Sequence, residues 1–121
     1  RAAYKYAGQA NLSPMLVLAI IEKESSLKPD AKSGYGAVGL MQVVPRFHAE
    51  KLPGDTPAEH TASLKHPETN IRVGTQIVAE YVAEQGGSLE RGLRKYSGNA
   101  TAYLKKVLRF RQELEQQAQG T

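Results

Sequence analysis

A glutamate at the end of an apolar segment is the residue of this chain best placed for acid chemistry. Residues 15–21 are all apolar, and Glu22 and Glu24 follow shortly after them. A helical side chain lies over residues three and four positions earlier, so Glu24 lies over Ile20 and Ile21, and spacing slightly favours it over Glu22 as the buried acid. The alternative is that both are solvated glutamates that close a helix, although a carboxylate there faces the unfavourable end of the helix dipole.

The other ionisable residues do not form a site of their own. Five further acids lie in expected loops or near expected helix starts, where solvation or capping accounts for them: Asp30, Glu50, Asp55, Glu59 and Glu68. His48, His60 and His66 lack the i, i+4 spacing of a helical zinc site, and the chain has no cysteine. We therefore predict no metal and no cofactor. The sequence also contains no phosphate-binding loop, nucleophile elbow or dinucleotide fingerprint.

The glycine-rich stretch after the glutamate resembles a known family. Its motif residues are Glu24-Ser25, Pro29, Ser33, the Gly-Ala-x-Gly-Leu-Met-Gln run at 36–42, and Pro45. Farther along come Leu64, Pro67, Asn70-Ile71 and Gly74, and then Tyr-Leu-Lys-Lys-Val-Leu at 103–108. This pattern is similar to that of the soluble lytic transglycosylases, goose-type-lysozyme-like enzymes that cut bacterial peptidoglycan. The resemblance covers about 12–108.

One motif departs from the family pattern. Where the family has Ala-Tyr-Asn-x-Gly, this chain reads Lys95-Tyr96-Ser97-Gly98-Asn99, and the interval from Tyr96 to Tyr103 is short. These differences bear on the wall of the donor subsite and on the substrate range. They leave the acid in place.

The resemblance implies a mainly α, lysozyme-like (goose-type) helical domain with an irregular glycine-rich active-site loop. Most glycosidases need a second carboxylate as nucleophile or base, and only Glu24 is well placed here. The resemblance implies that the N-acetyl group of the muramoyl sugar stabilises the cation and that its C6 hydroxyl attacks in place of water, which leaves a 1,6-anhydromuramoyl end. Glu24 would act first as acid and then as base, with a pKa raised toward roughly 6 by burial.

The same resemblance implies which residues surround the acid. Ser33 and Gln42 match positions that hydrogen-bond the substrate, with a turn residue and a satisfied loop amide as the alternatives. Tyr96 and Tyr103 match tyrosines that border the acid, where they could bond its carboxyl, stack on a sugar or pack in the core. Met41 contacts substrate or fills core space.

The pattern itself adds the remaining candidates. Tyr35 lies between two glycines, and we expect it to be exposed along the groove. Ser25 is expected to position the Glu24 backbone. Gly36 and Gly39 are expected to adopt backbone conformations that a side chain would obstruct.

The elements that must position these residues are helical. Ser13-Pro14 and Ser88 are helix-start signals, Gly86-Gly87 is a stop, and the region 58–65 is ambiguous. Helices are expected at 2–10, 14–25, 45–51, 67–85 and 88–96, and in a last helix that carries Tyr103, Leu104, Val107, Phe110 and Leu114 inward. We predict one domain over 1–121, with a polar C-terminal helical tail from about 112 that frays beyond 115.

Charge and length limit the partners. The 121 residues carry 16 Lys and Arg against 12 Asp and Glu, and the formal charge of +4 includes a basic stretch at 91–111. That charge suits nucleic acid, an anionic membrane or a wall polymer equally, or a solvated surface. The longest apolar run is far below the ~20 residues that cross a bilayer.

With the family resemblance, these observations favour peptidoglycan glycan strands as partner, no nucleic acid and no transmembrane segment. The expected location is the bacterial periplasm or cell envelope. The chain opens without a leader-like segment, so we expect a fragment with further domains or envelope machinery beside it. The competing functions are a goose-type lysozyme hydrolase and a non-catalytic peptidoglycan-binding module.

Overall fold

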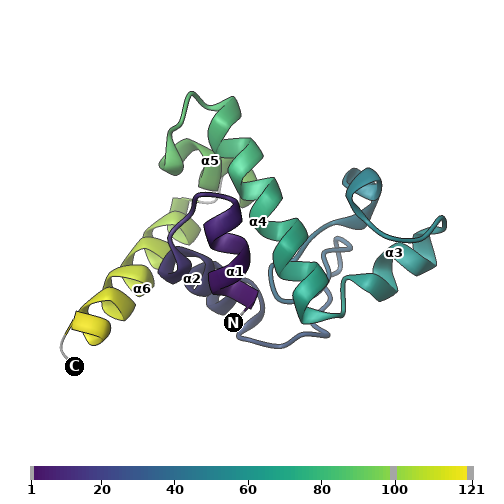
Figure 1. Ribbon diagram of the computed structural model, residues 1–121, viewed down its shortest axis with the longest axis horizontal. Helices are drawn as coiled ribbons and strands as arrows, with labels where there is room; N and C mark the ends of the chain where they lie inside the picture. The colour runs from purple at the N-terminus through teal and green to yellow at the C-terminus, as the bar shows by residue number, and fades with distance from the viewer. Residues whose placement is uncertain (1, 99–100, 120–121) are drawn as a thin grey trace.

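The computed structural model describes residues 2–98 and 101–119, which are mostly helical (Figure 1). The elements are α1 (Ala2–Gln9), α2 (Pro14–Ser25), the 3₁₀ helices η1 (Pro45–Phe47) and η2 (Ala49–Lys51), α3 (Pro57–Ser63), α4 (Pro67–Glu84), α5 (Leu89–Tyr96) and α6 (Thr101–Gln119). In these two ranges, β-structure is limited to isolated antiparallel bridges from Val38 to Lys32 and to Val43. The mainly α fold and the irregular loop after α2 are as predicted.

The helices begin where side chains can satisfy their first amide groups. Ser13 accepts a hydrogen bond from the Leu16 amide at the start of α2, and Ser88 does the same for α5. Helix α3 lies in the region that was ambiguous from sequence. Thr56 and Glu59 form a reciprocal capping box there, which stabilises a helix of only seven residues.

Two expectations about helix extent need correction. The segment predicted as one short helix at 45–51 is a pair of 3₁₀ turns separated at His48. The polar C-terminal tail does not fray at 115, because α6 continues to Gln119. An ion pair between Arg111 and Glu115, one helical turn apart, supports that extension.

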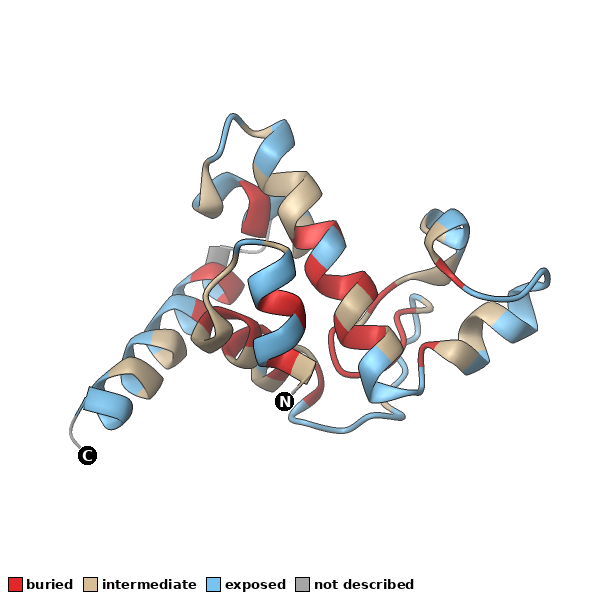
Figure 2. Cartoon of the chain, viewed as in Figure 1, coloured by how far each residue is buried: buried red, intermediate tan, exposed pale blue. Residues whose placement is uncertain are grey.

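Helix α2 is the centre of the core. Its buried side chains make contacts with α6 and α1, while α4 packs against both α1 and α5 (Figures 1 and 2). Met15 and Leu18 are half-buried, so the helix is less evenly enclosed than its apolar sequence suggested. The buried residues of α2 are Leu16, Val17, Ala19, Ile20, Ile21 and Ser25.

A buried amide ties the glycine-rich loop to this core. Asn70 of α4 is fully enclosed, and its Oδ1 accepts a hydrogen bond of 2.7 Å from the Met41 amide. Its Nδ2 donates to the carbonyl oxygens of Val38 at 2.8 Å and Leu64 at 2.9 Å. One side chain of α4 therefore adds bonds to the loop's own backbone bonds and fastens the loop to the helix.

The two loop glycines have the conformations predicted for them. Gly39 has φ +81°, and a Cβ there would collide with the Asn70 amide nitrogen and the Leu64 carbonyl oxygen. Gly36 has φ +103°, a region that side chains rarely adopt. The loop can therefore approach α4 closely only with glycine at position 39.

In the part of the chain that the structure describes, no helix is both long and apolar enough to cross a membrane.

Replacing Asn70 with alanine should lower the free energy of unfolding by about 3 kcal/mol, because the Met41 amide and the Leu64 carbonyl oxygen lose their partner and the Val38 carbonyl oxygen keeps only the Val43 amide. Urea unfolding of the purified variant measures this loss. Gln76→Ala, an exposed position on the same helix, is the matched control and should change stability by less than ~0.5 kcal/mol. Equal stability of the two variants would contradict the role given to Asn70.

Candidate active site

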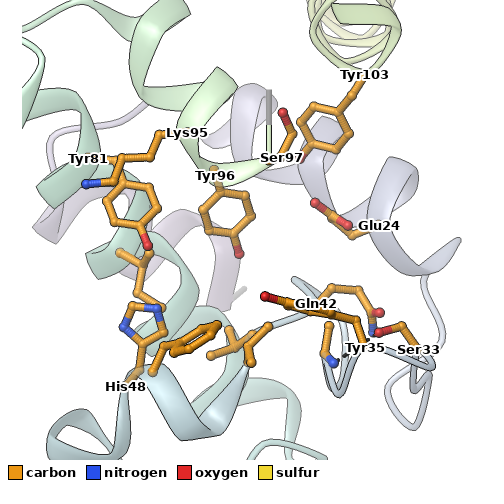
Figure 3. Close-up of a pocket in the computed structure, with 16 residues that line it drawn as sticks. Glu24, Ser33, Tyr35, Gln42, His48, Tyr81, Lys95, Tyr96, Ser97 and Tyr103 are labelled. Carbon is orange, nitrogen blue, oxygen red and sulfur yellow. Dashed lines mark hydrogen bonds between the residues drawn. The ribbon is translucent and has the colours of Figure 1, made fainter. Parts of the chain in front are cut away.

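A groove of about 500 Å³ runs along one side of the molecule. Its walls come from the glycine-rich loop, η1, α4, α5 and the start of α6, and Glu24 at the end of α2 also lines it (Figure 3). Segments far apart in sequence therefore meet around one carboxyl group.

Helix α2 ends abruptly beside the groove. Ser26 and Leu27 adopt left-handed conformations with φ +52° and +67°, and the Ser26 amide donates to the Glu22 carbonyl oxygen at 3.0 Å. The chain turns away from the helix axis at this point. Glu24 is left half-buried at the open end of the core helix, with its carboxyl group against the groove.

Burial strongly perturbs this carboxyl group. Loss of solvent raises the pKa of Glu24 from 4.5 to about 7, against a smaller lowering by the Tyr103 hydroxyl and by the charge of Lys23. The shift has the direction that the sequence suggested and is somewhat larger. Near neutral pH, about half of the molecules therefore carry the proton on Glu24.

Tyr103 on α6 is the nearest partner of this acid. Its side chain is 8% exposed, and its hydroxyl has no hydrogen bond of ordinary geometry within the described residues. The hydroxyl nevertheless lies close enough to influence Glu24, and burial together with the Glu24 charge raises the pKa of Tyr103 well beyond its usual range. A neutral O–H donor is thus held beside the carboxyl group, with Glu24 as the acceptor that it influences.

Tyr96 on α5 has a different role from Tyr103. Its hydroxyl donates to the Met41 carbonyl oxygen at 2.6 Å and so ties α5 to the loop. Its ring lines the groove and meets the Tyr81 ring edge-on, with centroids 6.3 Å apart. Tyr96 therefore packs against Tyr81 and also lines the groove. Its hydroxyl bonds Met41 and not Glu24.

Three of the loop residues that the sequence singled out line the groove. Ser33 Oγ accepts a bond from the Ala37 amide at 3.0 Å, and Gln42 Nε2 donates to the Gly39 carbonyl oxygen at 2.9 Å. Tyr35 is exposed and also lies on the groove wall. Ser33 and Gln42 are therefore satisfied loop residues that also face the ligand space.

Besides the two loop glycines, two candidate residues lie outside the groove. Ser25 is buried, and its hydroxyl donates to the Ile21 carbonyl oxygen at 3.1 Å, within the helix that carries Glu24. The Met41 side chain is fully buried, and its sulfur would lie 2.5 Å from a Cβ placed at Gly74. Direct contact between this methionine side chain and a ligand is therefore excluded by burial, and the alternative of core packing applies.

Sequence reasoning missed other residues that line the groove. Tyr81 on α4 lines the groove, although it was not singled out from the sequence. Lys95 lies with Nζ 4.4 Å from the Tyr81 ring centroid and pairs with Glu84. His48 was considered only as a metal ligand, and burial followed by the nearby charge of Lys51 lowers the pKa of its imidazole.

The motif that departs from the family pattern is partly visible. Ser97 lines the groove, and its hydroxyl donates to the Arg94 carbonyl oxygen at 3.1 Å. Asn99 lies outside the described residues. Among the residues that are described, no three His, Cys, Asp or Glu side chains come together as a metal site.

The sequence is similar to those of curated murein transglycosylases. It is 35% identical over 86 residues to the soluble lytic murein transglycosylase of Salmonella typhimurium, covering 69% of this chain and 13% of that protein. It is 38% identical over 78 residues to the membrane-bound lytic murein transglycosylase C of Actinobacillus pleuropneumoniae, covering 62% of this chain and 21% of that protein. The chain thus spans only a small part of these relatives.

The fold is similar to two crystal structures. The 70 kDa soluble lytic transglycosylase of Escherichia coli superposes with a TM-score of 0.73 at 23% identity, over 91% of this chain and 23% of that one. An inactive mutant of the lytic transglycosylase Slt of Pseudomonas aeruginosa gives 0.70 at 22% identity, over 92% and 21%. Residues 1–118 also match the model of a protein family described as "Transglycosylase SLT domain". That match extends over nearly the whole chain, and the chain therefore belongs to the transglycosylase SLT domain family.

Proposed function

We propose that this chain is the catalytic domain of a peptidoglycan lytic transglycosylase. It cleaves the β-1,4 bond between N-acetylmuramic acid and N-acetylglucosamine without hydrolysis and leaves 1,6-anhydromuramoyl ends. The observation that carries the proposal is Glu24, a carboxyl group with a pKa of about 7 on the wall of a groove. Family membership and the names of the relatives support murein as the substrate.

In the first step, protonated Glu24 donates its proton to the glycosidic oxygen as the bond from that oxygen to C1 of the muramoyl sugar breaks. A carboxyl group with a pKa near the working pH is suited to this transfer. The carboxylate that forms can accept a hydrogen bond from Tyr103, whose hydroxyl has no other partner of ordinary geometry in the described structure. A hydroxyl donates a stronger hydrogen bond to a carboxylate than to the neutral acid, so this contact with Tyr103 strengthens as Glu24 gives up its proton.

In the second step, the substrate supplies the groups that the groove lacks. Among the described residues that line it, Glu24 is the sole acid. The N-acetyl group of the substrate stabilises the positive C1, and the C6 hydroxyl then attacks C1 while Glu24 takes up its proton. The proton given in the first step returns, so Glu24 is ready for another turnover.

The other residues of the site divide by position. Ser33, Tyr35, Gln42, Tyr96 and Tyr103 line the groove and contact the glycan in this proposal. Positioning falls to Ser25 within α2, to Gly36 and Gly39 in the loop, and to Met41, which acts through its carbonyl oxygen and its buried side chain rather than by touching the substrate.

The proposal extends to organisation and location. The chain acts as one catalytic domain over 1–121 within a longer envelope protein, or beside other envelope machinery, at the bacterial cell wall. The exposed basic residues Arg91, Lys105, Lys106 and Arg109 give it a positive surface toward carboxylate-bearing wall peptides.

Glu24→Gln should lower turnover of purified cell walls at least ~10²-fold, because the amide cannot supply a comparable proton. Glu22→Gln, the same change two residues earlier on the same helix, should leave turnover unchanged. Mass spectrometry of the parent digest should show muramoyl ends that borohydride cannot reduce. Reducible ends would instead identify a hydrolase, and an inactive parent protein a binding module.

The pH dependence of kcat/KM should follow the ionisation of Glu24. Because the acid must begin protonated, the rate should fall as the pH rises through about 7, with an alkaline limb of slope one. Initial rates on soluble wall fragments between pH 5 and 9 measure this limb. A rate that stays flat to pH 9 would mean that another group supplies the proton.

Glu24 should also make folding stability depend on pH. The pKa of Glu24 is about 7 in the folded chain and near 4.5 in the unfolded chain. The free energy of unfolding therefore falls as the pH rises from about 4.5 to about 7, and Glu24 does not change it at lower pH. Glu24→Gln should therefore be more stable than the parent by up to about 3 kcal/mol at pH 8 and no more stable at pH 4. Urea unfolding at the two pH values measures the difference. A gain that is equal at both would contradict the buried carboxyl group.

A further inference from the structure

Two exposed aromatic rings lie together on the groove wall. Tyr35 and Phe47 both line the groove, yet they are 64% and 56% exposed. Their centroids are 6.4 Å apart, and the rings are inclined at 47°. Neighbouring apolar side chains that stay exposed on a monomer mark a place where something binds.

A single arginine holds the two rings. The guanidinium carbon of Arg46 lies 4.6 Å from the centroid of each ring, and its Nη1 donates to the Tyr35 carbonyl oxygen at 2.9 Å. Cation–π contact with both faces fixes the rings relative to each other and lowers the cost of ordering them when a ligand binds. Tyr35 lies in the glycine-rich loop and Phe47 in η1, and Arg46 connects these two segments because it contacts both rings.

A backbone feature makes room for this arginine. Gly36 has φ +103°, and a Cβ at this position would come within 3.0 Å of Arg46 Nη1. A side chain there would crowd the end of the guanidinium group, which would have to shift by a few tenths of an ångström. The absence of a side chain at Gly36 thus leaves space for the end of Arg46.

We propose that Tyr35 and Phe47 form a sugar-stacking platform, an outer subsite on which one pyranose ring of the glycan strand lies, and that Arg46 is its positioning residue. The C–H face of a pyranose is apolar, and an aromatic ring can cover it without removing the sugar hydroxyls from water. The labelled rings of Tyr35 and Tyr96 face the cavity from opposite sides (Figure 3). The inference rests on the proposed function, because that function supplies the glycan.

The platform should act on binding rather than on the chemical step. A stacked sugar remote from the reacting bond gains the same contact before and during the reaction, so its loss raises KM more than it lowers kcat. This separates the platform residues from Glu24, whose loss lowers kcat.

The test measures binding in a protein that cannot turn over the ligand. In the Glu24→Gln background, calorimetry with N-acetylglucosamine dimer and hexamer should show that Tyr35→Ala and Phe47→Ala each weaken hexamer binding about three- to tenfold. The dimer has fewer sugar rings that can lie on the platform while the groove is occupied, so its binding should be affected less. Tyr4→Ala, which removes an equally exposed tyrosine on α1 outside the groove, is the matched control and should bind as the background protein does.

Arg46→Met tests the positioning role, since it keeps the length of the side chain without its charge or donors. It should weaken hexamer binding while the melting temperature stays within a few degrees of the background, and Arg46→Lys should restore part of the affinity. On cell walls, the platform variants with Glu24 intact should show the KM effect described above.

Unchanged hexamer affinity in both aromatic variants would overturn the platform, and so would a Glu24→Gln protein that binds no oligomer. Neither result affects the proposed function if the parent still releases anhydro ends. Conversely, oligomer binding that depends on Tyr35 and Phe47 in a protein whose parent is inactive would leave the platform standing and remove the enzyme.

Discussion

The arrangement of the groove depends on one buried amide. The loop between α2 and η1 has isolated bridges and a few backbone bonds of its own, such as the pair between Val38 and Val43, but no sheet that joins it to the helices. Asn70 makes that connection by accepting from the Met41 amide and donating to the Val38 and Leu64 carbonyl oxygens. The side chain has both an acceptor and two donors, so it satisfies all three groups at once, and no apolar residue of the same size could do so. The loop wall is thereby anchored to α4, and the Tyr96 hydroxyl extends the connection to α5 through Met41.

Opposite this loop wall, α2 carries the Glu24 carboxyl group, which does not stabilise the fold. A carboxyl group whose pKa is raised to about 7 by burial is a cost to the folded state at neutral pH. The Tyr103 hydroxyl, buried beside this carboxyl group, is a second polar group withdrawn from water in the same place. Both are explained if the site is built for a charge that moves during the reaction, because a donor already in position need not reorganise when the carboxylate forms. The apolar surface of α2, packed on α6 and α1, provides the stability that tolerates them.

Local chemistry predicted most of the helices, and its failures have physical reasons. Ser13, Pro14 and Ser88 act within their own turns, so helix starts could be read without knowing the fold. Helix α3 was left ambiguous because it is short and has no buried residue, and its stability comes from a capping box that hydrophobic periodicity does not register. The 45–51 segment was predicted as one continuous helix because a proline start signal does not distinguish a continuous helix from two successive turns. The tail was given too little helix because its i, i+4 ion pair was not considered.

For the site, spacing in the sequence by itself favoured Glu24 slightly, at the end of an apolar helix, and the motif's likeness to a known family added Ser33, Gln42 and the loop glycines as candidates. Only the tertiary structure decided which side chains share the groove. It buried Met41 against Gly74, brought Tyr81 and His48 to the wall, and placed Arg46 between Tyr35 and Phe47. Periodicity reports which face of an element avoids water, but it does not report what lies opposite that face. Contacts between α4, α5 and the loop span tens of residues, and they exist only after the core has set those elements at their final distances.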